Sequence, residues 1–394
     1  MRSVEIKKGV YWVGAVDWDR RLFDSLIPLP DGTSYNSYLV VGSEKTALID
    51  TVDPAMHQVL FDNLEELGIK RIDYLVTNHA EQDHSGSIPL VLERFPEAQL
   101  LCTPKCQPMM VDLLNVPEAK ITTVADKEII SLGDRTLEFV HAPWVHWPET
   151  MLTYLKEERI LFSCDFFGSH LATTDAYVRD EAQVAESAKR YYAEIMMPFR
   201  TIIQKNLERV KEHQIDIIAP SHGPMYDNPG FIIDAYRSWA FDEPKNIVVL
   251  PYISMHGSTY LMVEYLVDAL AKNGVSVKQF DLTVADIGKL AMSLVDAATI
   301  VIGTPTVLAG AHPGAAYAAF LANALRPNTK FVSIIGSYEW GGKVVEQLAG
   351  MIPNIKAEII PPVVIKGLPG EADYAALEQL AETIAASHKE HHYV

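Results

Sequence analysis

Cysteine is scarce in this sequence, which has three in 394 residues, at Cys102, Cys106 and Cys164. Three cysteines are too few for a disulfide framework, and none of them belongs to a C-x-x-C pair, the arrangement found in zinc knuckles and many redox sites. A disulfide-stapled fold and a cysteine-ligated metal cluster are therefore excluded. Because disulfide-poor chains are typical of reducing compartments, we expect a cytoplasmic protein.

The sequence also has few basic residues relative to acidic ones and few long apolar runs. Lys and Arg total 33 against 51 Asp and Glu, a formal net charge of −18, which disfavours binding to nucleic acid or to an anionic membrane. The longest apolar stretch, Ala297 to Ala311, is interrupted by threonine, glycine and proline and is shorter than the roughly 20 apolar residues that span a bilayer. The first 20 residues carry charges throughout, unlike a secretory signal. We expect no nucleic-acid partner and no membrane partner.

Apolar residues are plentiful at 48%, and the length predicts two to three domains at about 150 residues each. The chain opens with short strand-like runs at residues 10–16, 37–41 and 46–50, followed to about residue 224 by strands mixed with helical stretches at residues 57–67 and 182–210. Pairs of strands follow one another directly in this part. The pattern predicts an α/β sandwich whose sheet is partly antiparallel.

Regular alternation begins after Asp242-Glu243-Pro244-Lys245. Strands are expected at residues 246–253, 276–281, 297–303, 330–336 and 357–364, and helices at residues 259–273, 285–294, 343–351 and 371–388. Such alternation is typical of a parallel, doubly wound sheet. We place a domain boundary near residue 245, which gives domains 1–245 and 246–394, and expect the tail from His388 to Tyr393 to fray at the surface.

A dense group of possible metal ligands follows the apolar run at residues 72–76. The segment Thr77 to Gly86 contains four such side chains within six residues, and three more candidates follow other strand-like runs. An isolated His or Asp in a loop usually only meets solvent, but loops at one sheet edge can converge on a single site. The candidates at these strand ends are His79, Glu81, Asp83, His84, His146, Asp165 and His222.

This set has four imidazoles and three carboxylates, which is enough for two metal ions if one carboxylate bridges them. Two-metal centres hold their ions about 3.5–4 Å apart, a span that a carboxylate can bridge. The pattern matches the metallo-β-lactamase superfamily, whose hydrolases usually have His-x-His-x-Asp-His here. Glu81 stands where the second His would be. A carboxylate in place of an imidazole makes the site harder and favours iron or manganese over zinc.

With Glu81 the sequence resembles the flavodiiron proteins, and the match extends through His146-Trp147-Pro148 and Ser221-His222-Gly223 to the order of both domains. The resemblance implies a metallo-β-lactamase-like αββα sandwich followed by a flavodoxin-like domain. It implies that His79, Glu81 and His146 hold one iron, that Asp83, His84 and His222 hold the other, and that Asp165 bridges them. It also places His170 and Tyr192 on the substrate side of the pocket. Asp24 departs from the His that many relatives have near the site.

A phosphate-binding loop is expected in the second half, where Ser254-Met255-His256-Gly257-Ser258-Thr259 leads from a strand into a helix. Hydroxyls and free amides at a helix N-terminus can hold a phosphate without lysine, although alone such residues are more often simple N-caps. Two more strand-end loops strengthen the prediction, Thr304-Pro305-Thr306-Val307-Leu308-Ala309-Gly310 and Gly336-Ser337-Tyr338-Glu339-Trp340-Gly341-Gly342. This half resembles flavodoxin, which implies flavin mononucleotide (FMN) bound by these loops; Leu308 and Ala309 depart from the Asn often found in relatives.

A flavin beside a carboxylate-rich dimetal site indicates reductive chemistry, because hydrolysis would leave the flavin without a task. The resemblance implies reduction of dioxygen to water, of nitric oxide to nitrous oxide, or of both, by a head-to-tail homodimer or a dimer of such dimers. With no C-x-x-C knuckles for a fused rubredoxin, electrons are expected from a separate rubredoxin-like protein or a reduced deazaflavin. Two alternatives remain open: a dizinc metallohydrolase with a flavodoxin-like regulatory domain, and an electron carrier or gas sensor with a degenerate site.

Overall fold

The computed structural model of the protein describes residues 2–394, and its contacts divide the chain into two compact units. Unit 1 comprises the residues up to Tyr192 together with Phe199–Ala240, and unit 2 comprises Ala193–Pro198 together with Phe241–Val394. The first strand of unit 2 begins at Lys245, at the position where the sequence pattern changes.

Unit 1 contains two facing sheets. The larger has the strand order β1-β2-β7-β8-β9-β10-β11, formed by Val4–Lys7, Val10–Trp12, Tyr38–Val41, Thr46–Ile49, Tyr74–Val76, Gln99–Cys102 and Ile121–Thr123. The smaller has the order β12-β13-β14-β15-β16, formed by Ile129–Ser131, Thr136–His141, Met151–Leu155, Ile160–Cys164 and Ile217–Pro220. Both sheets mix antiparallel and parallel pairs, as the sequence predicted. Two short hairpin-like pairs lie beside them, β3 with β6 (Ala15–Asp17, Thr33–Tyr35) and β4 with β5 (Leu22–Phe23, Ile27–Pro28).

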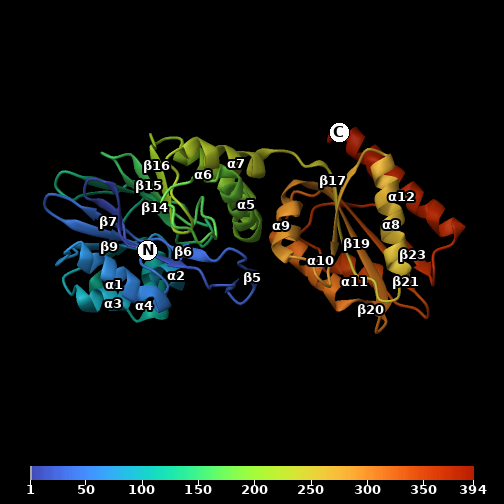
Figure 1. The fold of residues 1–394 in the computed structure, drawn as a ribbon, viewed down its shortest axis with the longest axis horizontal. Helices are drawn as coiled ribbons and strands as arrows, with labels where there is room; N and C mark the ends of the chain where they lie inside the picture. Colours follow the sequence, from blue (N-terminus) through green and yellow to red (C-terminus); the bar gives the residue numbers. More distant parts are fainter. Residues whose placement is uncertain (1) are drawn as a thin grey trace. The chain divides into compact units, whose positions relative to one another are not determined.

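Helices cover the outer faces of this sandwich (Figure 1). On one side lie α1, α3 and α4 (His57–Glu66, Ile88–Arg94, Cys106–Leu114), and on the other lie α5, α6 and α7 (Glu181–Tyr191, Arg200–Val210, Pro229–Phe241). Trp12 and Tyr38 of the larger sheet share a buried cluster with Phe139 and Phe162 of the smaller one. Burial of these large apolar side chains between the sheets stabilises the αββα arrangement, which confirms the predicted fold class.

The helical stretch expected at residues 182–210 is broken in two. Helix α5 ends at Tyr191, a π turn covers Tyr192–Met196, a 3₁₀ turn covers Met197–Phe199, and α6 begins at Arg200. Pro198 lies inside the break, and a proline within a helix removes a backbone donor and clashes with the preceding turn. The expectation of one continuous helix was wrong for this reason.

Unit 2 is a parallel sheet with the strand order β18-β17-β19-β21-β22, and β23 also pairs with β21. The strands are Lys245–Tyr252 (β17), Ser276–Asp281 (β18), Ala297–Val307 (β19), Phe331–Tyr338 (β21), Glu358–Ile359 (β22) and Val363–Lys366 (β23), and a short β20 (Gly310–Ala311) returns along β19. Numbered along the chain, the order of the parallel strands is 2-1-3-4-5, the flavodoxin order. The predicted doubly wound sheet is therefore confirmed.

Helices flank both faces of this second sheet. Figure 1 shows α8 and α12 (Ser258–Lys272, Glu371–Glu390) on one side and α9 and α10 (Ile287–Asp296, Pro313–Leu325) on the other, with α11 (Val344–Gly350) near β20. Helix α10 was not expected, because its alanine-rich sequence has little contrast between an apolar and a polar face. The strand expected at residues 357–364 is split into β22 and β23 around Pro361 and Pro362, since proline cannot donate to a sheet ladder.

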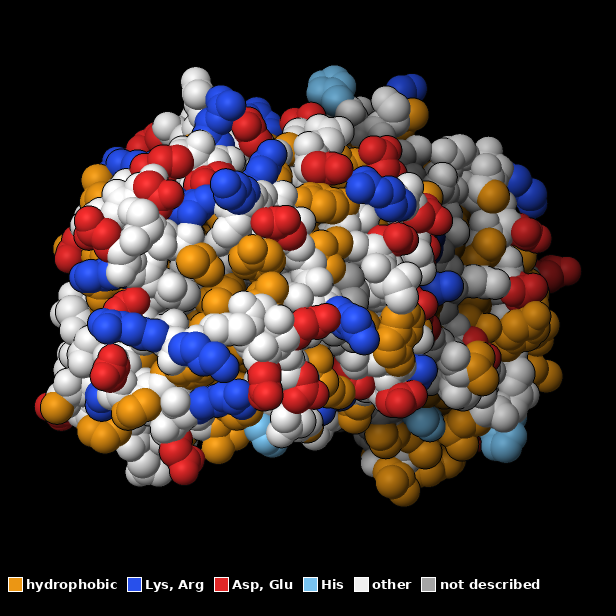
Figure 2. Space-filling view, turned by 60° about the vertical axis from the view of Figure 1, so that its left-hand side comes forward, with side chains coloured by type: hydrophobic (Ala, Val, Ile, Leu, Met, Phe, Trp, Pro, Cys, Tyr) orange, Lys and Arg blue, Asp and Glu red, His pale blue; other side chains and the backbone are white. Residues whose placement is uncertain are grey.

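No helix in the described part of the chain is long and apolar enough to cross a membrane. On the face shown in Figure 2, Lys and Arg side chains alternate with Asp and Glu, and no broad patch of one sign is visible. A surface of this kind offers no extended basic footprint for a phosphate backbone on that face.

The C-terminal tail is anchored at His388, contrary to the expectation of a frayed end. His388 is fully buried; its Nε2 lies 2.7 Å from Thr299 Oγ1 and its Nδ1 lies 2.8 Å from Asn246 Oδ1. Because Asn246 offers an acceptor, Nδ1 donates to it and the Thr299 hydroxyl donates to Nε2. Burial, with a smaller contribution from His391, lowers the pKa of His388 from 6.5 to about 4. The neutral ring thus joins α12 to the first residues of β17 and β19.

Replacing His388 tests this anchor. We expect His388→Ala to lower the free energy of unfolding by about 2 kcal/mol, because Thr299 and Asn246 would lose their buried partner. In the unfolded chain the histidine takes up a proton below about pH 6.5, whereas in the folded chain it does so only near pH 4. The free energy of unfolding of the wild type should therefore fall as the pH drops from 6.5 to 4, and that of the variant should fall less. Chemical denaturation followed by circular dichroism at pH 7 and pH 5 measures both effects. His392→Asn, at an exposed tail position, is the control, and equal pH dependence in all three proteins would contradict the assignment.

Candidate functional site

The loops at one edge of the unit 1 sandwich bring the seven predicted metal ligands together. His79 and Glu81 follow β9, and the short helix α2 (Gln82–Ser85) carries Asp83 and His84. The other three follow β13, β15 and β16. Ligand atoms of His79, Glu81, His146 and Asp165 lie within 4.8 Å of one another, and so do those of Asp83, His84 and His222. The structure therefore forms two adjoining groups from residues that are up to 143 positions apart.

Asp165 lies between the two groups and faces each with a different oxygen. Its Oδ2 is 3.4 Å from His79 Nε2 and 3.2 Å from His146 Nε2. Its Oδ1 is 3.0 Å from His84 Nε2 and 3.5 Å from His222 Nε2. This arrangement is the one that a bridging carboxylate requires.

Each group also has a carboxylate of its own. Glu81 Oε2 lies 3.1 Å from the Nε2 atoms of both His79 and His146. Asp83 Oδ2 lies 3.3 Å from His84 Nε2 and 3.2 Å from His222 Nε2. The two groups thus have the same composition, two imidazoles and one carboxylate, on either side of Asp165. We call the place enclosed by His79, Glu81 and His146 position 1 and the place enclosed by Asp83, His84 and His222 position 2.

The chemistry of this donor set fits bound cations. Among the described residues, both carboxylate oxygens of Asp83 and of Asp165 are buried without a hydrogen-bond partner, which is costly unless a cation is present. Burial lowers the pKa of His84, but the carboxylates of Asp83 and Asp165 outweigh it and raise the pKa to about 9. Burial likewise opposes ionisation of Asp165, yet His84, His146 and His79 hold its pKa well below the ordinary value. The pocket therefore favours positive charge among its carboxylates.

The other ring nitrogens of two ligands are fixed by partners outside the groups. His222 Nδ1 donates to the Ser34 carbonyl at 2.6 Å, and His79 Nδ1 donates to Glu149 Oε1 at 2.7 Å. Both bonds leave Nε2 facing the carboxylates, as metal-binding histidines require. Sequence reasoning did not find Glu149; its signal was its place three residues after His146.

Cys164 lies beside His84 and Asp165 and completes a third group of possible ligands. Burial, with the nearby charge of Asp165, raises the pKa of the Cys164 thiol well above its ordinary value. Because metals bind the thiolate rather than the thiol, Cys164 is a poor ligand here. The described cysteines are all free and buried.

His170, which the resemblance places on the substrate side, lies next to position 2. Its ring centroid is 4.7 Å from that of His222 and 4.9 Å from that of Phe23, and its Nδ1 is 2.9 Å from Thr33 Oγ1. Its Nε2 is buried without a hydrogen-bond partner among the described residues. Burial, reinforced by His222, holds the pKa of His170 well below its ordinary value, so the ring is neutral.

Tyr192 is not where the sequence placed it. Its hydroxyl lies 3.3 Å from the Trp239 carbonyl oxygen, and its ring packs against Tyr236 and Trp239. The neighbouring Tyr191 occupies the site side instead, with its ring centroid 4.9 Å from that of His170 and 5.8 Å from that of His222. Side chains of adjacent helix residues point about 100° apart. Naming the residue one position too far along therefore selects a side chain that faces the core instead of the site.

A cavity of 440 Å³ opens beside the metal groups. Phe23, Asp24, Glu81, Asp83 and Trp147 are among the residues that line it. Burial, together with the charge of Glu81, raises the pKa of Asp24 to about 6. Asp24, which departs from the family pattern, is therefore part of the wall next to Glu81.

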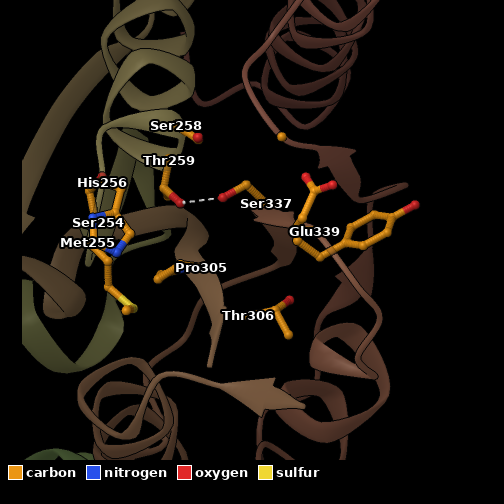
Figure 3. A pocket seen from close by; sticks show the side chains of 11 residues that line it. Ser254, Met255, His256, Ser258, Thr259, Pro305, Thr306, Ser337 and Glu339 are labelled. Atoms are coloured by element: carbon orange, nitrogen blue, oxygen red, sulfur yellow. Dashed lines mark hydrogen bonds between the residues drawn. The ribbon is translucent and has the colours of Figure 1, made fainter. Parts of the chain in front are cut away.

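A second cavity, of 220 Å³, lies in unit 2 where the three predicted flavin loops meet. It is lined by Ser254, Met255, His256, Ser258, Thr259, Pro305, Thr306, Ser337, Tyr338, Glu339 and Gly367. Figure 3 shows the Thr259 and Ser337 hydroxyls facing each other, 3.2 Å apart. The Ser254 hydroxyl accepts from the Gly257 and Tyr260 amides, and Gly257 has a φ of 95°, which favours glycine.

The remaining predicted flavin residues lie near this cavity but do not line it. They are Gly257, Thr304, Val307, Leu308, Ala309, Gly310, Trp340 and Gly341. Leu308 and Trp340 are 89% and 75% exposed, and Leu308 and Ala309 have positive φ angles. Gly367 lines the cavity and was not predicted, because it follows β23, a strand whose bounds the sequence did not resolve.

The cavity suits a phosphorylated ligand by its chemistry. The N-terminus of α8, a helix of 15 residues, opens at Ser258, and the hydroxyls around it can donate to phosphate oxygens. The Thr306 hydroxyl is buried without a partner among the described residues. These groups fit the FMN phosphate and ring that the resemblance implies.

Comparison with known proteins agrees with this architecture. Residues 33–223 match the model of the ODP family beta lactamase. The chain is 36% identical to a nitric oxide reductase of Moorella thermoacetica over 98% of each chain, and 33% identical to an anaerobic nitric oxide reductase flavorubredoxin of Vibrio vulnificus over 88% of this chain and 72% of that one. It superposes on rubredoxin oxygen:oxidoreductase of Desulfovibrio gigas with a TM-score of 0.95, at 30% identity over 99% of each chain. A flavodiiron protein from Giardia intestinalis gives a TM-score of 0.89, at 28% identity over 98% of each chain.

The fold and the site define an oxidoreductase in which a β-lactamase-like unit with a carboxylate-rich dimetal donor set is followed by a flavodoxin-like unit. The chain belongs to the flavodiiron proteins. The predicted family and enzyme class are confirmed.

Removing the carboxylate between the two groups tests the metal centre. We expect Asp165→Asn to lose most of its bound metal, because Asp165 faces all four imidazoles and its charge balances both positions. Elemental analysis of metal per chain after reconstitution measures the loss. Asp216→Asn is the matched control, since Asp216 pairs with Arg159 at the surface. Full metal content in Asp165→Asn would contradict the assignment.

Proposed function

We propose that the chain reduces dioxygen to water, nitric oxide to nitrous oxide, or both, at a diiron centre held by the six residues of positions 1 and 2 and by Asp165 between them. The observation that carries this proposal is the pair of matched groups sharing Asp165, which suits two like metal ions. Seven donors with three carboxylates favour iron over zinc. When bound, the two irons supply reducing electrons and open positions for a small gas, and FMN delivers electrons one or two at a time.

The residues around the irons have distinct tasks in this proposal. Asp165 fixes the two positions relative to each other. Glu149 orients His79, and Ser34 orients His222. The neutral ring of His170 offers a hydrogen-bonding nitrogen next to position 2 without adding charge. The buried Tyr191 hydroxyl keeps its proton, because burial and the Asp165 charge raise its pKa well above the ordinary value.

The unit 2 cavity is the proposed FMN site. The phosphate would bind Ser254, Ser258 and Thr259 at the N-terminus of α8, and the loops after β19 and β21 would hold the ring. Among the described loops around the cavity, none supplies a lysine or arginine to its lining. Binding therefore depends on hydroxyls and backbone amides.

Electrons would come from a separate donor in the cytoplasm, either a rubredoxin-like protein or a reduced deazaflavin. Two relatives support the first choice by name, the rubredoxin oxygen:oxidoreductase and the flavorubredoxin. The three cysteines of this chain have no C-x-x-C spacing, so an internal rubredoxin site of that kind is not available.

We also propose that two chains pair head to tail, so that the FMN of one serves the irons of the other, either as a single dimer or as a dimer of such dimers. Exposed apolar side chains beside the flavin cavity support this pairing: Met255, Leu308 and Trp340 are all exposed. Large apolar side chains gathered around a cofactor mark a surface that is covered in an assembly.

The function is tested by steady-state gas consumption. Anaerobically reduced protein with full iron and FMN should consume dioxygen, nitric oxide or both when supplied with rubredoxin or reduced deazaflavin. Elemental analysis of the purified protein should find about two irons per chain. Two zinc ions per chain with hydrolytic activity would favour the metallohydrolase, and loaded protein that consumes neither gas would refute the proposal.

Subunit complementation tests the pairing. Asp165→Asn removes the metal centre, and Ser254→Asp places a negative charge where the phosphate would bind, so each variant alone should be inactive. Coexpression should restore about one quarter of wild-type activity, because half of randomly formed dimers are hybrids with one complete flavin–iron pair. A coexpressed sample as inactive as either variant would show that each chain serves itself.

A further inference from the structure

The two metal positions have matched inner donors but different surroundings. Each is enclosed by two imidazoles and one carboxylate, and both share Asp165. Differences in behaviour between them must therefore come from groups behind these side chains. The four imidazoles show where such a difference lies.

Of the four imidazoles, His79 is the one whose second nitrogen bonds a carboxylate in the described structure. Its Nδ1 donates to Glu149 Oε1 at 2.7 Å, and both side chains are fully buried. His222 Nδ1 donates instead to the neutral Ser34 carbonyl, and His84 Nδ1 is buried without a partner. A negative charge behind a ligating imidazole makes its other nitrogen a stronger electron donor.

Glu149 is itself held firmly. The Ala80 amide donates to the same Oε1 at 2.9 Å, and the Thr103 hydroxyl donates to the Glu149 carbonyl at 2.9 Å. The Trp147 ring lies edge-on to His79, with centroids 5.1 Å apart and planes at 88°. The carboxylate can therefore not swing away from His79 without breaking its bond to the Ala80 amide, while the Thr103 hydroxyl holds the backbone of Glu149.

The influence of Glu149 is directed at position 1. His79 Nε2 is 3.1 Å from Glu81 Oε2 and 3.4 Å from Asp165 Oδ2, the two carboxylate oxygens on that side. Asp50 is another buried carboxylate nearby, but its two oxygens accept from the Asn78 backbone and side-chain amides and bond no imidazole. Asp24 lines the cavity beside Glu81 and is half-exposed to it.

We propose that Glu149 is a positioning residue that makes the two irons unequal: it fixes His79 and places a buried negative charge behind position 1, which stabilises the ferric state there. This inference rests on the proposed iron occupancy. Position 1 would then have the lower reduction potential, so reduction of a diferric pair would begin at position 2. The residue that distinguishes the positions lies outside the seven ligands.

Glu149→Gln removes the negative charge of the side chain and keeps its shape. Its amide oxygen can still accept hydrogen bonds from His79 and Ala80. In a potentiometric titration followed by electron paramagnetic resonance, the potential of the second electron should rise and that of the first should change little. We expect the ferric-to-ferrous ratio at position 1 to fall about tenfold at a fixed potential, which is 59 mV for one electron. The range of potentials over which the mixed-valent signal persists should narrow.

Two controls separate this effect from structural damage. Glu138→Gln makes the same change at another carboxylate–imidazole pair, where Glu138 Oε1 lies 3.3 Å from His213 Nε2 away from the ligands, and should leave both potentials unchanged. Glu149→Asp keeps the charge and should stay nearer the wild type. Equal shifts of both potentials in Glu149→Gln, or no shift, would overturn the proposal.

Metal binding gives a readout that does not need redox activity. If Glu149→Gln does not retain both irons, titration of the apoprotein with ferrous iron or zinc should show one site weakened about 10- to 100-fold and the other unchanged. Equal weakening of both sites would overturn the proposal. A protein that binds zinc at unequal sites but consumes neither gas would refute the proposed function and leave the role of Glu149 intact.

Discussion

The site depends on one buried carboxylate that faces four imidazoles. Moving Asp165 out of water costs several kcal/mol, and no single partner in the structure repays it; the cost is offset by imidazoles from three different loops, of which the one after β9 supplies both His79 and His84. Those loops follow strands of both sheets in the sandwich, so the packing of the sheets fixes the spacing of the ligands. Residues as distant as the Trp12–Phe162 core therefore contribute to the geometry of the centre.

The two units contain sites that suit ligands of opposite charge. Unit 1 concentrates carboxylates and imidazoles in a buried place, where a cation would satisfy the oxygens of Asp83 and Asp165 that have no hydrogen-bond partner among the described residues. Unit 2 opens a cavity whose lining is rich in hydroxyls at the start of α8 and lacks lysine and arginine, so its dipoles rather than its charges suit an anion. In a chain with a net charge of −18, local arrangement thus suits both kinds of ligand, which the overall charge does not reveal.

The sequence was sufficient to name the seven candidate ligands that the structure brings together, because strand ends are visible in it. His146, Asp165 and His222 each follow an apolar run that forms a strand. The sheet topology brings the ends of these strands to one edge of the sandwich. Alternating strands and helices were likewise enough for the flavodoxin-like sheet, although the alanine-rich α10 and the proline-split β22 and β23 were not resolved. Glu149 was missed because its one signal, a place three residues after His146, does not show that its carboxylate turns back to His79. Tyr192 was named through the family resemblance, and the structure has its neighbour Tyr191, the last residue of α5, beside His170 and His222 instead.

The burial of every described cysteine has a practical side. Cys106 and Cys164 both have thiol pKa values raised well above the ordinary range, by hydrogen bonding to Cys102 and burial in the first case and by burial in the second, so they resist alkylation and oxidation. The described thiols are therefore poor targets for labelling reagents. A cysteine introduced at a surface position would be the accessible thiol for a fluorescent or spin label, so a label can be placed without first removing native residues.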